Sequence, residues 1–147
     1  AFQRALGGRV RAFVKEDSAP APGETVEDDL LIRADKNPNT AAARALFGDV
    51  PPVFEEGTDL LLVWGEGLDF SRLPPRVPII YLNAYLQPEN GHADVFLPVS
   101  VQTERAGHYT NFQGVVSAFE PCFAKRDSVA HAEALFAALA SPAGLRP

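Results

Sequence analysis

The chain has 147 residues, of which 46% are apolar, and it carries a formal charge of -6 with an isoelectric point near 5.0. That length and apolar content suit one domain with a buried core and argue against global disorder. The acidic balance argues against a nucleic-acid interface, which needs a clustered basic face, and against electrostatic docking to an anionic membrane.

The first third of the chain predicts two helices and two strands. The opening "AFQRALGG" has the pattern of a helix already in progress that ends at its glycines, so we expect a fragment of a longer polypeptide, or a processed one. Alternation predicts a strand over Val10 to Val14, and residues 16–27 have the composition of a surface loop. A second strand is expected over Asp29 to Asp35, then an alanine-rich helix over Thr40 to Phe47 that Gly48 closes.

The middle of the chain predicts the core of a parallel sheet. "TDLLLVWGEG", from Thr58 to Gly67, is expected to form the clearest buried strand, and further strands are expected over Val77 to Leu82 and in "ADVFLPV". Even the longest apolar run, "DLLLVWG", has strand length and falls well short of the ~20 residues that cross a bilayer. Apolar runs separated by short helices predict an α/β fold with a small doubly wound, mostly parallel sheet.

The last third of the chain predicts a hairpin and a final helix. "HYTNFQGVVSAFEP" is expected to form an irregular hairpin, and Ser128 is expected to cap the helix "VAHAEALFAALA". One face of that helix carries Val129, Ala132, Leu135, Phe136 and Leu139. We therefore expect a single α/β domain over residues 1–147, with a C-terminal hairpin and helix.

The single cysteine, Cys122, limits the redox and metal chemistry of the chain. It can form no internal disulfide, and it cannot supply a thiolate-rich zinc site or a four-cysteine iron–sulfur cluster. Its apolar neighbours in "EPCFAK" indicate a buried and unreactive thiol. A reducing, cytoplasmic setting fits this cysteine usage.

A glycine-containing turn follows the first apolar run of the sheet. "GEGLDF" after Leu60 to Trp64 partly matches a dinucleotide-binding loop, but it lacks the third glycine and is followed by prolines at Pro74 and Pro75. We favour a simple turn at a strand end. Trp64 itself is favoured as a packing residue over a stacking platform for a ligand.

An asparagine-rich turn, "ADKNPNTA", offers a second candidate ligand site. Asp35, Asn37 and Asn39 follow a predicted strand end, where open α/β sheets place ligands. The same residue types make local turns and helix caps without any ligand. We favour the turn, with Asn39 or Thr40 as the N-cap of the following helix.

A polar loop gathers four groups with chemical potential within eight residues: Glu104, His108, Tyr109 and Asn111. Glu104 and His108 are candidates for a general acid–base pair. No nucleophile with a partnering base is apparent in the sequence, and the three histidines lie far apart, so no metal-ligand spacing is recognisable. We favour a structural role, with Thr110 and Asn111 holding a tight loop.

The stretch "ADVFLPVSVQTERAGHYTNFQGVVSAFEP" resembles a segment of the molybdopterin oxidoreductases and of their relative, the large iron–sulfur G subunit of bacterial NADH-quinone oxidoreductase. The family pattern reads approximately A-D-V-x-L-P, a short gap, E, then G-T-x-x-N-x-E-G-R. The matching residues are Ala93, Asp94, Val95, Leu97, Pro98, Glu104, Gly107, Asn111 and Gly114. Upstream, "DLLIRADKNPNTAAARALFG" is similar to the family's strand, turn and helix, so the resemblance covers residues 29–121.

Three positions depart from the family pattern. His108 stands where the family often has threonine, Gln113 replaces a glutamate, and Val115 replaces an arginine. In members that carry a cofactor this loop lies near the pterin dinucleotide, and valine lacks the five N–H donors of arginine. The resemblance thus leaves only a vestigial pocket, with Glu104, His108, Asn111 and Gln113 as its candidate residues.

These departures favour the G-subunit branch and imply a partial Rossmann-like domain without catalytic, cofactor-binding or metal-binding residues of its own. The chain would act as a scaffold of a respiratory NADH dehydrogenase, contacting its other subunits or domains at the cytoplasmic face of the membrane without inserting into it. Iron–sulfur clusters would lie in other modules of the parent protein. Asp94 and Pro98 would define and terminate the last strand, and Glu104 and Asn111 would bond backbone amides of the following loop.

Two other functions remain open at this point. The chain could belong to the cofactor-binding domain of an active molybdopterin dehydrogenase of the formate type, in which case a molybdopterin would be bound. It could also be a free-standing small binding module that reuses the fold.

Overall fold

The computed structural model describes residues 10–13, 22–24, 27–28, 39–48, 54 and 56–141. These residues belong to two compact units. The sheet unit falls within residues 1–11, 53–107 and 120–147, and the hairpin unit falls within residues 12–52 and 108–119. The expectation of a single domain over residues 1–147 stays a prediction.

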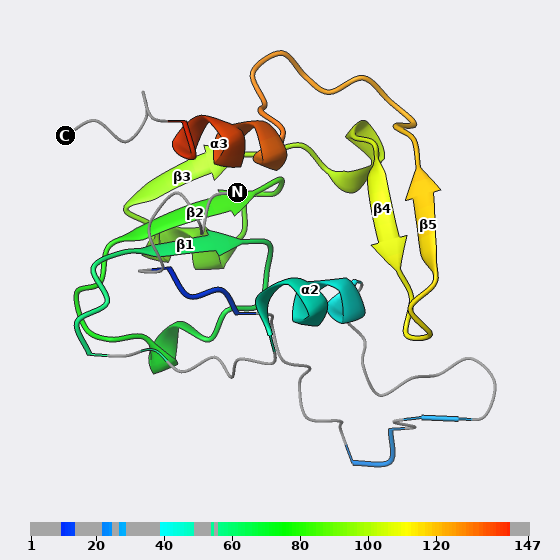
Figure 1. The fold of residues 1–147 in the computed structure, drawn as a ribbon. Helices are drawn as coiled ribbons and strands as arrows, with labels where there is room; N and C mark the ends of the chain where they lie inside the picture. The colour runs from blue at the N-terminus through cyan, green and yellow to red at the C-terminus, as the bar shows by residue number, and fades with distance from the viewer. Residues whose placement is uncertain are drawn as a thin grey trace. The chain divides into compact units, whose positions relative to one another are not determined.

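A parallel sheet forms the centre of the sheet unit (Figure 1). Its three strands, β1 (Leu61–Trp64), β2 (Ile79–Asn83) and β3 (Val95–Pro98), are paired in chain order. Both pairings are parallel, and the register places Trp64 beside Leu82. The predicted α/β class with a small, mostly parallel sheet is confirmed.

The central strand, β2, is the most buried element of the sheet unit. Tyr81 is 0% exposed and its neighbour Leu82 is 1% exposed, although successive side chains of a strand point to opposite faces. On the Leu82 face, a core cluster with Val99 and Ala132 is extended by half-buried side chains. Among these are Leu135 and Phe136 of α3 (Ala132–Leu139), so α3 covers this face.

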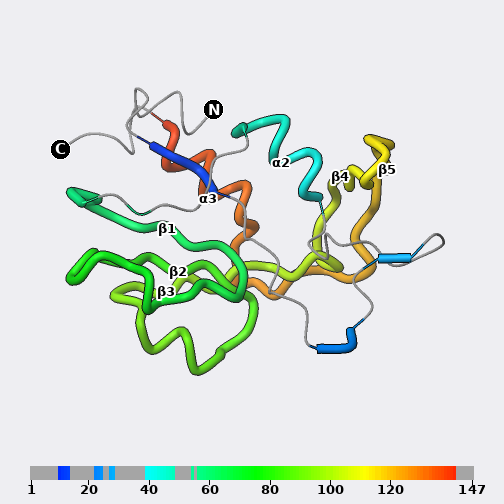
Figure 2. The backbone as a smooth tube through the Cα atoms, turned by 90° about the horizontal axis from the view of Figure 1, so that it is seen from below, coloured from blue at the N-terminus to red at the C-terminus, as the bar shows by residue number. Residues whose placement is uncertain are grey.

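The opposite face of β2 is covered by two short 3-10 helices. Phe70, in η1 (Phe70–Arg72), stacks on the Tyr81 ring with 6.1 Å between centroids. The Tyr81 hydroxyl donates a hydrogen bond of 2.6 Å to Glu89 of η2 (Pro88–His92). Both faces of the parallel sheet are therefore occupied, as such sheets require. The path of the chain through these crossovers can be followed in Figure 2.

The ends of β3 match the roles expected for Asp94 and Pro98. Asp94 Oδ2 accepts a hydrogen bond of 2.8 Å from the Ile79 amide, which ties the start of β3 to the start of β2. Pro98 is the last residue of β3, and the following Val99 amide donates to the Asn83 carbonyl. Proline is tolerated here because β3 has a strand partner on only one side.

The last helix begins later than expected. Ser128 lies in a turn, and the N-cap position of α3 is His131, without a side-chain cap bond. The reason is a non-local pairing: Ala130 forms a parallel bridge with Val99, and its carbonyl accepts from the Ser100 amide at 2.9 Å. Residues held in extended pairing cannot also form the first turn of a helix.

Several strand predictions need correction. Residues 10–13 were expected as part of a strand but do not form one. Alternation of apolar and polar residues indicates a half-buried surface, but it does not specify a neighbouring strand to pair with. The run expected to be the most buried begins at an exposed Leu60, and β1 is only half-buried. Its position at the end of the strand order accounts for this. The predicted strand over Asp29 to Asp35 lies outside the described residues.

The hairpin unit contains α2 (Thr40–Phe47) and a two-stranded sheet of β4 (Gly107–Thr110) and β5 (Val116–Phe119). Both the helix bounds and the hairpin agree with the prediction. The helix is rich in alanine, the strongest helix former, and Gly48 ends it at φ 82° with its amide bonded to the Arg44 carbonyl at 2.8 Å. No helix in the described part of the chain is long and apolar enough to span a bilayer.

Substituting aspartate at two positions of β3 tests the assignment of its faces. Leu97 packs against the core cluster, so Leu97→Asp should cost about 3–5 kcal/mol by burying an unpaired charge. Val95 is 46% exposed, and Val95→Asp should therefore cost about 1 kcal/mol or less. Denaturant unfolding measures both costs; equal losses would contradict the assignment.

The buried Tyr81 predicts a loss of stability in alkali. Burial, aided by the bond to Glu89, raises the pKa of Tyr81 above its ordinary value near 10. The unfolded chain therefore releases this proton from about pH 10 upward while the folded chain retains it, so stability is complete below that pH and falls as pH rises. Thermal unfolding followed from neutral pH to about pH 11 should show a shallower decline for Tyr81→Phe. Tyr85→Phe, on an exposed side chain, should keep the steep decline; equal slopes for the two variants would refute the assignment.

Candidate functional site

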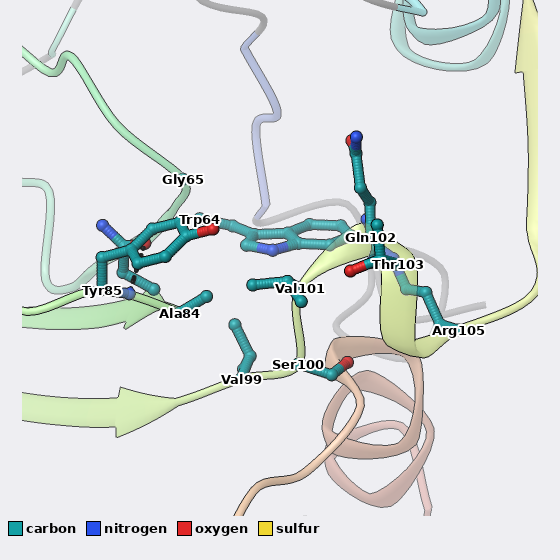
Figure 3. A pocket seen from close by; sticks show the side chains of 11 residues that line it. Trp64, Gly65, Ala84, Tyr85, Val99, Ser100, Val101, Gln102, Thr103 and Arg105 are labelled. Carbon is teal, nitrogen blue, oxygen red and sulfur yellow. Dashed lines mark hydrogen bonds between the residues drawn. The ribbon is translucent and has the colours of Figure 1, made fainter. Parts of the chain in front are cut away.

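A pocket of about 400 Å³ opens at the carboxyl ends of the three parallel strands (Figure 3). Its lining includes Trp64, Asn83, Tyr85, Ser100, Gln102 and Arg105. This is the edge at which open α/β sheets bind ligands, because loops diverge there above the strand ends. All of the lining residues belong to the sheet unit.

The end of β1 places an aromatic ring in the pocket. Gly65, at φ 101°, turns the chain away from the sheet while its amide still bonds the Leu82 carbonyl at 3.0 Å. The ring of Trp64, about half exposed, extends across the pocket in Figure 3 and makes a tilted contact with Phe136 at 5.6 Å. Trp64 therefore packs against Phe136, as the predicted packing role requires, and also lines the pocket.

The short helix η3 (Gln102–Glu104) forms another wall of the pocket. Glu104 Oε2 accepts a hydrogen bond of 3.1 Å from the Val101 amide, which closes the turn at the start of η3. Arg105 follows, with its guanidinium 5.3 Å from the Trp64 ring centroid and its Nη1 2.9 Å from Glu133 Oε1. The Arg105 guanidinium thus interacts with both the face of the Trp64 ring and the exposed carboxylate of Glu133.

A serine and a histidine meet beside the pocket, which sequence inspection missed. The Ser100 hydroxyl lies 2.7 Å from His131 Nδ1, and Ser100 is buried. This is within reach for a nucleophile and a base, but the same bond joins the end of β3 to the start of α3. No local motif signals this contact, because the Val99–Ala130 bridge brings the two residues together.

The four vestigial-pocket candidates do not gather at this pocket. Glu104 lies in η3 of the sheet unit, whereas His108, Asn111 and Gln113 belong to the hairpin unit. None of the four lines the pocket. The His108 side chain is exposed on β4, and the Tyr109 ring stacks on Phe119 at 4.9 Å.

Asn111 organises the hairpin turn as the sequence predicts. Its Oδ1 accepts hydrogen bonds of 2.9 Å from both the Gln113 and the Val115 amides. Gly114, at φ 81°, completes the turn. Asn111 Oδ1 is thus engaged by two backbone amides, and the Val115 side chain offers no hydrogen-bond donor.

The asparagine before α2 is its N-cap residue, as expected, but its side chain bonds a different element. Asn39 occupies the N-cap position at φ 66° but makes no side-chain cap bond. Its Oδ1 instead accepts from the Thr110 amide at 2.7 Å, and its Nδ2 donates to the His108 carbonyl at 3.4 Å. Asn39 therefore joins the start of α2 to β4. Asp35 and Asn37 lie outside the described residues.

The glycine-containing turn after β1 leads into a 3-10 helix, in line with the favoured turn. Asp69 caps η1 by accepting from the Ser71 hydroxyl at 2.6 Å and from the Ser71 amide at 3.0 Å. These two bonds lower the pKa of Asp69. The side chain that follows the glycines thus serves the local turn.

Cys122 is exposed, contrary to the expected buried thiol. The Cys122 and Phe123 amides both donate to the Thr103 carbonyl, which holds this segment on the surface of the sheet unit. Among the residues that the structure describes, no group of three potential ligands from histidine, cysteine, aspartate and glutamate converges on a metal site. Comparisons with protein-family models, with curated proteins and with solved structures found no match.

Substitutions of Asn111 test its role in the turn. Asn111→Ala removes the acceptor for two amides and should cost about 1–2 kcal/mol, whereas Asn111→Asp keeps an acceptor and should cost less. Amide hydrogen exchange at Gln113 and Val115 should accelerate in Asn111→Ala. His108→Ala, which removes an exposed side chain, is the control; unchanged exchange in Asn111→Ala would refute the role.

Proposed function

We propose that the chain is a non-catalytic scaffold domain of a G-type subunit of NADH-quinone oxidoreductase, descended from a molybdopterin oxidoreductase. It acts at the cytoplasmic side of the membrane and contacts other subunits or domains of the respiratory dehydrogenase. The resemblance over residues 29–121 suggests this family. The electron carriers lie in other modules, and this chain supplies an α/β body that supports the electron-transfer arm and presents surfaces to neighbouring subunits.

The observation that carries the proposal is the apolar tip of the hairpin. Phe112, Val115 and Val116 are 62%, 53% and 61% exposed, at the segment where the resemblance implies cofactor contacts. Exposed apolar side chains that cluster in sequence on one turn suit contact with another protein more than contact with phosphates. An arginine at this position would suit contact with a cofactor phosphate, whereas Val115 suits contact with another protein.

The hydrogen bonds of the neighbouring polar residues support the same proposal. Glu104 and Asn111 match the family pattern, and each accepts hydrogen bonds from backbone amides of its own turn. These bonds use Glu104 Oε2 and Asn111 Oδ1 to stabilise the loop. A scaffold would retain these residues for shape after losing the cofactor.

The alternative is the cofactor-binding domain of an active molybdopterin dehydrogenase. The pocket at the carboxyl ends of the parallel strands favours it, since that is where such domains bind ligands. Molybdenum, tungsten and pterin analysis of the intact protein separates the two functions. A near-stoichiometric metal or pterin content would reject the scaffold.

A charge at the hairpin tip should weaken assembly. Val116→Lys places an ammonium group in the proposed contact and should reduce association with the partner subunits at least tenfold, or about 1.4 kcal/mol. Native mass spectrometry of the assembled dehydrogenase measures this loss. Leu86→Lys, at a more exposed leucine of the sheet unit, is the matched control. Full assembly of Val116→Lys, or equal losses in both variants, would count against the hairpin as the contact.

A further inference from the structure

Two residues that line this pocket each carry a buried donor atom without a hydrogen bond. In the described part of the chain, the buried side-chain nitrogens or oxygens that lack a hydrogen bond are Asn83 Nδ2 and Arg105 Nε. Both residues line the pocket at the carboxyl ends of the strands. A buried donor without an acceptor is costly, so native proteins rarely retain one without a reason such as a bound ligand. Both atoms carry N–H groups, which indicates that the missing partner is an acceptor.

The orientation of Asn83 is fixed by its own turn. The side chain is only 4% exposed, and its Oδ1 accepts from the Tyr85 amide at 3.2 Å. Nδ2 is therefore the end of the amide left to donate. The Asn83 side chain also lies close to the Tyr81 hydroxyl, where it opposes the rise of the Tyr81 pKa.

Arg105 supplies the positive charge of the pocket. It is the one charged residue among those lining the pocket, and its guanidinium is held over the Trp64 ring. Its ion pair is with Glu133, whose side chain is 59% exposed, and an exposed pair of this kind contributes little stability. A ligand anion at Arg105 would compete with Glu133 for the guanidinium and would give Nε an acceptor.

The remaining walls suit a flat ring. Trp64 and Tyr85 both line the pocket with aromatic side chains that are 48% and 58% exposed. A volume of about 400 Å³ lies within the range of small-molecule sites. Aromatic walls with a few convergent donors recognise a planar group that carries acceptor oxygens.

We propose that this pocket binds a small planar organic anion, an aromatic or heteroaromatic carboxylate. Its ring lies against Trp64 and Tyr85, and its carboxylate accepts hydrogen bonds from Arg105 and Asn83. The site belongs to the sheet unit alone and does not depend on the proposed scaffold function or on the hairpin.

The single tryptophan of the chain provides a direct measurement, because Trp64 is itself a wall of the pocket. Titrating benzoate into the 147-residue chain should change Trp64 fluorescence to saturation, with a dissociation constant in the millimolar range or tighter. Benzamide has the same ring without the charge and should bind at least tenfold more weakly. Absence of a saturable change with benzoate, or equal binding of benzamide, overturns the proposal.

Substitutions of Arg105 test whether its positive charge binds the carboxylate of benzoate. Arg105→Gln should weaken benzoate binding at least tenfold, and Arg105→Lys should restore part of it, since lysine keeps the charge but not the planar fork. Arg126→Gln removes an exposed arginine elsewhere in the sheet unit and should leave binding unchanged. Equal affinities of the Arg105→Gln and Arg126→Gln chains would overturn the role of Arg105.

A measurement on the unsubstituted chain guards against misfolding of the variants. Side-chain amide signals of asparagine and Nε–H signals of arginine are observed directly by nitrogen-15 nuclear magnetic resonance. Benzoate should shift the Asn83 Nδ2 and Arg105 Nε signals and leave Asn90, whose side chain is engaged in the η2 turn, in place. Unmoved Asn83 and Arg105 signals at saturating benzoate would overturn the proposal.

Discussion

The burial of β2 on both faces is the constraint on which the sheet unit depends. Tyr81 and Leu82 are adjacent and point to opposite sides of the sheet, yet both are removed from water. One side therefore needs α3, and the other needs Phe70 and Glu89 from the 3-10 helices. The pocket lies at the carboxyl ends of the strands, where the loops that follow them diverge.

Elements with strong local signals were predictable from the sequence. The bounds of α2 follow from its alanine content and from Gly48, and the hairpin turn follows from the capacity of Asn111 to bond amides ahead of it. The start of α3 was not predictable, because the Val99–Ala130 bridge sets it. The hydrogen bond between Asn39 and Thr110 was not predictable for the same reason, since the two residues are distant in sequence. Local pattern carries no information about such partners.

The candidate site also depends on contacts between residues that are distant in sequence. The polar loop was a candidate site because Glu104, His108 and Asn111 are close together in the chain. In the structure, the hydrogen bonds of Glu104 and Asn111 stabilise their own turns. The pocket is built from residues with ordinary sequence surroundings, such as Asn83 and Arg105. They become notable only when the sheet brings them together and leaves donors of both without acceptors.

The attachment of α3 has a consequence for the order of folding. Its links to the sheet, Val99 to Ala130 and Ser100 to His131, join segments about 30 residues apart in sequence. During synthesis all three strands leave the ribosome before α3 does, so the Leu82 face is exposed to solvent until the helix arrives. A nascent chain that lacks α3 therefore leaves the apolar side chains around Leu82 exposed to water, where they can associate with other apolar surfaces.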